Sequence, residues 1–174
     1  MTETYSLHAP DLEWQALVGK AILRFGDIEL ISFRCLAHIP TDKIAESAAR
    51  LEFSRRADIL IEILEGRPAL PEPLAALLAG FKRAKVLART RNLIAHNPVM
   101  LDIYVNHHTE DIYAEHTIAS ARSSGSTLTI EQLREFAAEV EDLSSSLWLH
   151  FMQASNSSDS LFQRWSRKSG LIDK

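Results

Sequence analysis

The sequence is poor in cysteine, glycine and proline, and these shortages narrow what the protein can be. Its single cysteine, Cys35, excludes an intrachain disulfide. Cys35 lies among apolar residues at helical spacing, so we expect a buried thiol. Six glycines and six prolines in 174 residues leave few chain breaks, as in a mostly helical protein. The length fits one domain with a real core, in a reducing compartment.

Long apolar runs are also missing. No run approaches the roughly 20 residues that a helix needs to cross a bilayer. The start, Met-Thr-Glu-Thr-Tyr-Ser, lacks the basic and then apolar pattern of a signal peptide. We therefore expect a soluble, cytoplasmic protein that does not contact a membrane.

Several common catalytic motifs are absent. The sequence holds no Gly-rich phosphate loop, no nucleophile elbow and no paired-carboxylate motif. His107, His108 and His116 cluster near Glu110 and Asp111, but their spacing matches no tight zinc pattern. Adjacent histidines in a polar loop are usually solvated. We keep a metal site here only as a third alternative and expect neither a metal nor another cofactor.

The charge distribution is uneven. The formal net charge is −4, yet no acidic residue occurs between Glu72 and Asp102. A basic window inside an acidic chain indicates an anionic partner, and phosphate suits the geometry of arginine. The basic residues of this window are Lys82, Arg83, Lys85, Arg89 and Arg91.

The apolar periodicity predicts an all-α fold, an up-down bundle of about four long helices. The first helix runs from about residue 10 to 38. The second is capped by Thr41 or Asp42 and ends at Gly66 in the left-handed conformation. The third runs from about Leu74 to His96. A heptad seam marks the first helix, at Trp14, Val18, Ala21, Phe25, Ile28, Ser32 and Cys35.

The period changes after Pro98. Alternating apolar residues in 101–105 and 112–118 predict a β-hairpin insertion after the third long helix, at about residues 99–119. Thr129, with Gln132 three residues later, predicts the capped start of a last long helix to about residue 153. We expect residues 1–9 to form a flexible arm, 10–153 the domain, and 154–174 a mobile polar and basic tail.

The stretch from Arg89 to Pro98 is the strongest candidate site. On a helical wheel, Val86, Leu87, Leu93 and Ile94 form a core-facing arc, whereas Arg91 stands in a groove of small residues. Pro98 ends the helix, so Asn97 is the expected exit point and His96 lies in the last turn. The small residues of the groove are Ala84, Ala88 and Ala95.

Each of these residues has two interpretations. His96 suits a general acid or base at neutral pH, but histidine is also common as a helix cap. The basic residues could bind phosphate or simply form a solvated face. Glu29 could face the basic helix and orient Arg91 or His96, or it could be a solvated carboxylate at the edge of the seam.

The element Arg91-Asn92-Leu93-Ile94-Ala95-His96, near the end of a helix in the second half of a small helical domain, resembles the Arg-Asn-x-x-x-His element of the HEPN superfamily. As an architecture the resemblance covers residues 10–153; as a motif it covers six residues. One toxin branch of the family has a tyrosine two residues after the histidine. Pro98 stands there in this chain, so that branch's regulation is not carried over.

The resemblance implies a homodimeric, metal-independent endoribonuclease, with a composite cleft between two copies of the Arg/His element. Such proteins act as toxins, with a cognate antitoxin, or in phage defence. The resemblance implies that Arg91, His96 and Asn92 are catalytic, with Glu29 and Asn97 in support. We expect Lys82, Lys85 and Arg89 to follow the RNA backbone. The alternative is a non-catalytic helical dimer that binds RNA, nucleotide or a protein partner.

Overall fold

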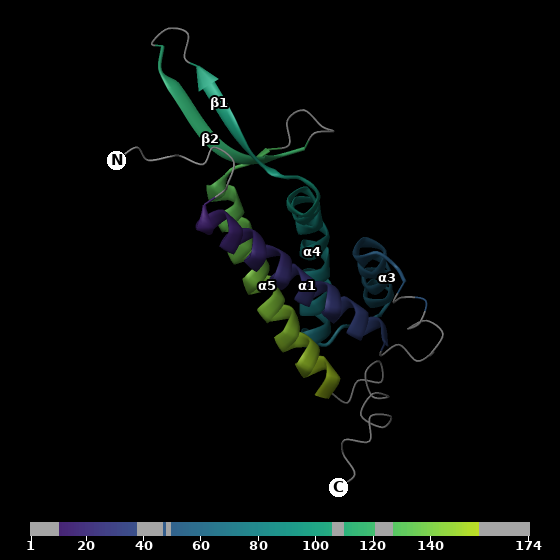
Figure 1. Ribbon diagram of the computed structural model, residues 1–174. Helices are drawn as coiled ribbons and strands as arrows, with labels where there is room; N and C mark the ends of the chain where they lie inside the picture. The colour runs from purple at the N-terminus through teal and green to yellow at the C-terminus, as the bar shows by residue number, and fades with distance from the viewer. Residues whose placement is uncertain (1–10, 38–46, 48–49, 106–109, 121–126, 157–174) are drawn as a thin grey trace.

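The computed structural model describes residues 11–37, 47, 50–105, 110–120 and 127–156. Within them the chain is mostly helical, with a small antiparallel sheet at one end of the helices (Figure 1). None of the helices so described is long and apolar enough to span a membrane. The elements are α1 (Leu12–Ala37), α3 (Phe53–Glu65), α4 (Glu72–His96), β1 (Val99–Val105), β2 (Ile112–Ala119), β3 (Thr127–Leu128) and α5 (Ile130–Asn156).

Helix α1 buries the heptad seam that the sequence predicts. The Asp11 carboxylate accepts a hydrogen bond from the Trp14 backbone at 3.0 Å and caps the helix. The seam residues are buried, except Val18, which is partly buried. Helix α1 packs on α5, α3 and α4. Burial raises the pKa of the Cys35 thiol. Because the seam packs inside its own chain, it gives no support to a dimer.

The second helix is shorter than predicted. Leu51 lies in a bend, Glu52 is extended with φ −63° and ψ 155°, and α3 begins only at Phe53. The caps proposed at Thr41 and Asp42 lie outside the described residues. Gly66 ends the helix as expected, but in the right-handed conformation, with φ −68°. The described part of the chain therefore contains three long helices and a short one.

Helices α4 and α5 pack closely at Gly80. A Cβ atom at this buried position would lie 2.6 Å from Cδ2 and 3.1 Å from Cγ of Leu147, which is also buried. The absence of a side chain at Gly80 thus allows the close approach of α5.

Replacing Gly80 by valine is expected to destabilise the fold by about 2 kcal/mol, because the added methyl groups overpack a core with no free space. The free energy of unfolding from urea denaturation measures the loss. Gly26→Val is the control for the residue type, since a Cβ atom at Gly26 would meet nothing within 4 Å. Equal losses in the two variants would contradict the packing explanation.

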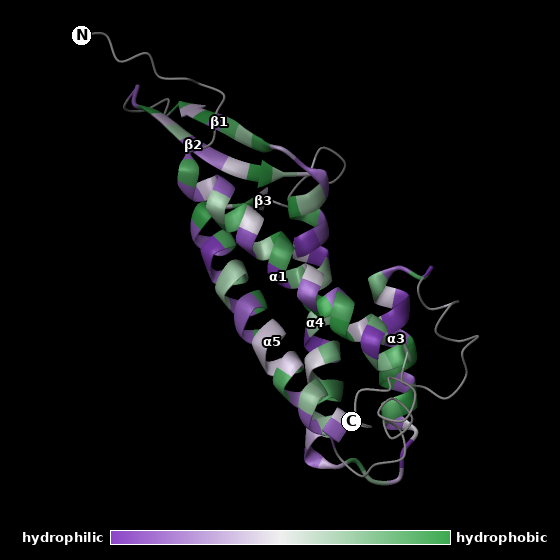
Figure 2. Cartoon of the chain, turned by 60° about the horizontal axis from the view of Figure 1, so that its bottom comes forward, coloured by the Kyte–Doolittle hydropathy of each residue, from purple (hydrophilic) through white to green (hydrophobic). Residues whose placement is uncertain are grey.

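The predicted hairpin is confirmed. Strands β1 and β2 pair antiparallel from Val99 opposite Ile118 to Val105 opposite Ile112. A third strand, β3, was not predicted; it pairs with β2 and places Leu128 opposite Ile118, and both are buried. These apolar residues hold the sheet on the ends of the helices, with its outer part projecting away from them (Figure 2).

The start of α5 has the predicted capping box. The Thr129 backbone donates to the Gln132 side chain at 3.0 Å, and the Gln132 backbone donates to Thr129 Oγ1 at 3.4 Å. The helix extends to Asn156, past residue 153, where we expected the tail to begin, and Ala154 packs in the core. The remaining tail, 157–174, and the arm, 1–9, lie outside the described residues.

Candidate functional site

The C-terminal end of α4 is built as the sequence predicts. The helix ends at His96, and Asn97 is extended with φ −130° and ψ 145° because Pro98 follows it. The Asn97 side chain turns back and donates to the Leu93 carbonyl at 2.8 Å, which satisfies one of the unpaired carbonyl groups of the last turn. Asn97 therefore supports the site by fixing the helix end that carries His96.

Arg91 and His96 open into the same pocket. It has a volume of about 390 Å³ and lies where α4 meets α1 and the start of α3. Arg91 is partly buried, whereas Asn92 and His96 are exposed. The pocket is lined by Phe25 and Glu29 from α1, by Leu51, Glu52, Phe53, Ser54 and Arg56 from α3 and the segment before it, and by Ala88, Arg91, Asn92 and His96 from α4.

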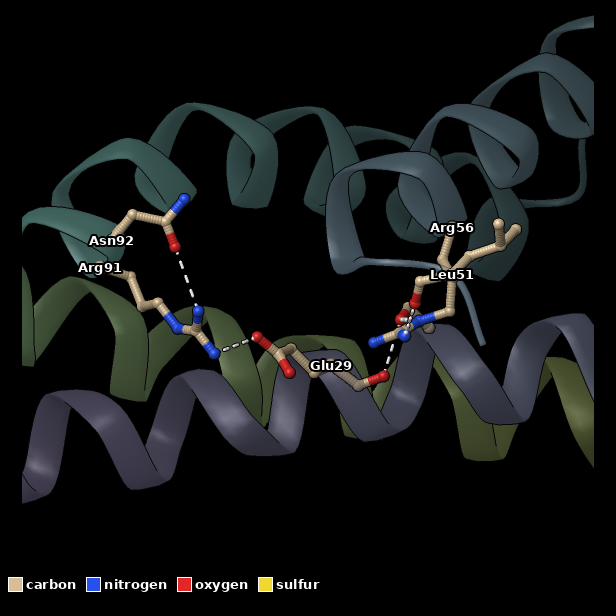
Figure 3. Close-up of polar contacts among 6 residues, drawn as sticks. Glu29, Leu51, Arg56, Arg91 and Asn92 are labelled. Atoms are coloured by element: carbon tan, nitrogen blue, oxygen red, sulfur yellow. Dashed lines mark hydrogen bonds and ion pairs between the residues drawn. The ribbon is translucent and has the colours of Figure 1, made fainter. Parts of the chain in front are cut away.

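The Arg91 guanidinium is held in a fixed orientation. Its Nη2 donates to Glu29 Oε1 at 2.6 Å, and its Nη1 donates to Asn92 Oδ1 at 3.1 Å (Figure 3). Its carbon Cζ lies 5.5 Å from the centre of the Phe25 ring, within cation–π range. The buried Nε has no hydrogen-bond partner among the described residues. Glu29 therefore faces the basic helix and contacts Arg91, and it is not simply a solvated carboxylate at the edge of the seam.

The Asn92 side chain contacts Arg91. Its amide oxygen accepts from Arg91, which leaves the amide nitrogen as the group available for donation to a ligand. No described residue hydrogen-bonds the His96 ring, so the imidazole lies at the pocket without a fixed partner. The arrangement therefore joins an oriented guanidinium and an accessible imidazole.

Arg56 is a pocket residue that the sequence reasoning missed. Its Nε donates to Ser32 Oγ at 3.1 Å and its Nη1 to the Leu51 carbonyl at 2.5 Å. Burial lowers the pKa of the Arg56 guanidinium from its ordinary value, and the Glu29 carboxylate partly offsets this. Glu29 thus lies between Arg91 on α4 and Arg56 on α3 (Figure 3).

A signal for Arg56 was present in the sequence. Arg56 lies three residues after Phe53 and four before Leu60, at the edge of the apolar stripe of α3. A charged residue beside a buried stripe usually has a specific partner. We missed the role of Arg56 because we predicted a continuous helix through residue 51. Such a helix leaves no pocket at the start of α3.

The proposed RNA-binding side chains lie around the pocket rather than in it. Lys82 pairs with Glu65 at 2.6 Å, and Lys85 pairs with Asp58; both acids belong to α3. Such exposed ion pairs are weak and exchange readily with other anions. Arg89 is exposed and has no ion pair among the described residues. Arg89 is thus the basic residue of this group most available to an anion.

The predicted faces of α4 need correction. Val86 was assigned to the core-facing arc but is 57% exposed. Ala84 and Ala88 were assigned to a groove of small residues, but both are buried in the core of their own chain, and Ala95 is exposed. Helix α4 packs against α1, α3 and α5. These neighbours widen the buried face of α4 and shift that face toward the alanines. A helical wheel drawn for α4 alone cannot show this.

The predicted histidine cluster at the hairpin lies partly outside the described residues. His107 and His108 lie outside the described residues, and the residues that are described contain no group of three side chains able to hold a metal ion. His116 lies on β2 opposite Leu101, and its Nε2 is buried without a partner.

The fold and the pocket together define a class: a helical protein with an Arg/His pocket at the end of one long helix. No family model, curated protein or solved structure matches the chain.

Proposed function

We propose that the protein is a metal-independent endoribonuclease of the HEPN type. One observation carries the proposal: Arg91, oriented by Glu29, and His96 line one pocket at the end of α4. An arginine and a histidine are the groups needed to bind a phosphodiester and to move a proton at neutral pH. The up-down bundle of four long helices and the homodimer typical of that family are part of the proposal.

The reaction is attack of an RNA 2′-hydroxyl on the adjacent phosphorus. His96 takes the 2′-hydroxyl proton as the new oxygen–phosphorus bond forms. The bond to the 5′-oxygen breaks, and the His96 of a second subunit returns a proton to that oxygen. Arg91 and the Asn92 amide nitrogen donate to the phosphate oxygens, whose charge rises in the transition state. The products are a 2′,3′-cyclic phosphate and a 5′-hydroxyl.

The surrounding groups favour a polyanion over a single small anion. Arg89 lies two residues before Arg91 on the exposed side of α4, and Lys82 and Lys85 continue the basic surface along the helix. These residues bind the RNA backbone on either side of the pocket, so the contribution of each falls as salt rises. A toxin or phage-defence role, with or without an antitoxin, fits such an enzyme.

A second candidate is a non-catalytic dimer that binds RNA, nucleotide or a protein partner at the same pocket. It is favoured by the charge of the pocket lining, where the carboxylates of Glu29 and Glu52 balance the guanidiniums of Arg56 and Arg91. This candidate predicts salt-sensitive binding without turnover.

Incubating the purified full-length protein with end-labelled RNA in excess EDTA separates the two. We expect cleavage to continue in EDTA, because Arg91 and His96 supply the chemistry that a metal would otherwise supply. The new 3′ ends should resist ligation until a phosphatase that opens cyclic phosphates is added. Binding without cleavage in any RNA pool supports the second candidate. Cleavage that requires a divalent ion contradicts the proposed mechanism.

A further inference from the structure

The pocket extends beyond the groups that the proposed reaction uses. Its volume of about 390 Å³ lies in the range of pockets that enclose a whole small molecule, and a phosphate group fills only a small part of it. Figure 3 shows Arg91 and Arg56 on opposite sides of Glu29, one on α4 and the other on α3. The wall formed by α3 is therefore available to another part of the ligand. We call this wall the α3 side of the pocket: Glu52, Phe53, Ser54 and Arg56.

The Glu52 carboxylate has no partner within the described part of the chain. Glu52 is exposed and directly precedes α3, but its side chain forms no capping hydrogen bond. Glutamate is also not among the residues that cap a helix best at this position. No described residue forms an ion pair with it. In a pocket that binds a phosphate, a carboxylate repels the ligand unless it accepts hydrogen bonds from a neutral part of that ligand.

Arg56 offers a hydrogen-bond donor close to this acceptor. Its backbone donates to the Glu52 carbonyl at 3.1 Å, so the two residues lie one helical turn apart. The Arg56 guanidinium does not pair with Glu52, because its Nε donates to Ser32 and its Nη1 donates to the Leu51 carbonyl. These contacts fix the guanidinium and leave Nη2 without a hydrogen-bond partner among the described residues. The α3 side therefore presents one donor nitrogen and a carboxylate with two acceptor oxygens.

We propose that the α3 side of the pocket is a guanine subsite. The Watson–Crick edge of guanine carries, in order, the O6 acceptor and the N1–H and N2–H donors. Arg56 Nη2 donates to O6, and the two oxygens of Glu52 accept from N1–H and N2–H. The phosphate of the same nucleotide lies at Arg91, so the inference rests on the proposed function for the place of the phosphate. The protein then cleaves RNA beside guanosine.

The other three bases do not complement Glu52 and Arg56. Adenine and cytosine each have one amino group next to a ring nitrogen, and the lone pair of that nitrogen repels the carboxylate. Uracil has a single N–H between two carbonyl oxygens. Enclosed sites reject a ligand that leaves a polar group unpaired by about 10⁴-fold. Because Glu52 is exposed, water replaces part of a lost hydrogen bond, and we expect a preference of about tenfold instead.

The cut sites of the full-length protein in an RNA of balanced composition test the subsite. Cleavage beside guanosine should be at least about tenfold faster than beside any other nucleoside. Glu52→Gln should reduce this preference to within about threefold, because the glutamine amide turns its own N–H₂ group toward a guanine donor. Glu62→Gln is the matched control, since Glu62 is an exposed glutamate of α3 outside the pocket, and it should keep the preference. Cut sites without a preference for guanosine overturn the proposal.

Inosine tests the contact between Glu52 and the base directly, because inosine lacks only the N2 amino group of guanosine. Replacing the guanosine at one cut site by inosine should slow cleavage by the wild type about tenfold, since one hydrogen bond to a charged acceptor is lost. The same replacement should change the rate for Glu52→Gln by less than about threefold. A purely structural role of Glu52 predicts equal effects of inosine in the two proteins, and that result overturns the contact.

Nucleotide binding to His96→Ala separates the subsite from catalysis. This variant lacks the proposed proton acceptor but keeps Glu52, Arg56 and Arg91. By calorimetry, guanosine 3′-monophosphate should bind at least about tenfold more tightly than adenosine 3′-monophosphate. Equal affinities overturn the subsite, even if the wild type cleaves RNA. A guanine preference in a protein that cleaves no RNA overturns the endoribonuclease and supports the subsite, so the two failures are distinguishable.

Discussion

Replacing His96 by alanine is expected to lower the rate of RNA cleavage by about 10³-fold, because the reaction loses the group that accepts the 2′-hydroxyl proton. The fold should be unchanged, since His96 is exposed in the last turn of α4 and no described residue hydrogen-bonds its ring. RNA affinity should change little, because Arg91, Arg89 and the lysines are untouched. Single-turnover cleavage and filter binding on the same RNA measure the two effects.

The matched control for this prediction is His150→Ala. His150 lies on α5, and its Nδ1 lies 3.0 Å from Gln153 Oε1. It does not line the pocket, so its replacement should leave cleavage at the wild-type rate. A His96→Ala protein that cleaves RNA as fast as the wild type would end the proposed mechanism.

Arg91→Lys is expected to lower the cleavage rate about 100-fold although it keeps the positive charge. Arg91 reaches Glu29 at 2.6 Å and Asn92 at 3.1 Å with two nitrogens of one rigid group. Lysine has a single charged nitrogen and cannot reproduce this fork or the contact with the Phe25 ring. Loss of one well-placed donor to a developing oxyanion has an effect of this size. Because the charge remains, RNA binding should fall much less than the rate.

Two variants control for Arg91→Lys. Arg83→Lys changes another arginine of α4, which pairs with Glu139 on α5 away from the pocket, and should leave the rate unchanged. Glu29→Gln keeps an oxygen acceptor for Arg91 and should retain most activity, whereas Glu29→Ala should lose more. Equal rates for wild type and Arg91→Lys would show that only the charge of Arg91 matters.

Local features of the site could be predicted because their causes are local. Pro98 forces Asn97 out of the helix, so the end of α4 and the place of His96 follow from adjacent residues. The alternation of apolar residues in 101–105 and 112–118 predicted the hairpin, because this alternation is also a local pattern. The contact of Glu29 with the basic helix was one of two interpretations, and it was supported only by the position of Glu29 at the edge of the seam.

Other features depend on neighbours that are distant in sequence. Arg56 reaches Ser32 across 24 positions of the chain, and no spacing rule connects the two. Lys82 and Lys85 pair with acids on α3, whose start was predicted too early. The short strand β3 exists because Leu128 is buried opposite Ile118. Each of these contacts forms only when separate elements pack together.

The sequence by itself determined where α4 ends, where the hairpin lies, and that Arg91 and His96 share the end of one helix. It did so because helix and strand periods, caps and prolines act over a few residues. Only the tertiary structure decided that Glu29 contacts Arg91, that Arg56 lines the pocket, and that Ala84 and Ala88 are buried in the core. The physical reason is that a side chain becomes buried or paired only when another element packs against it. The residues of that element can be distant in sequence, so local patterns do not reveal them.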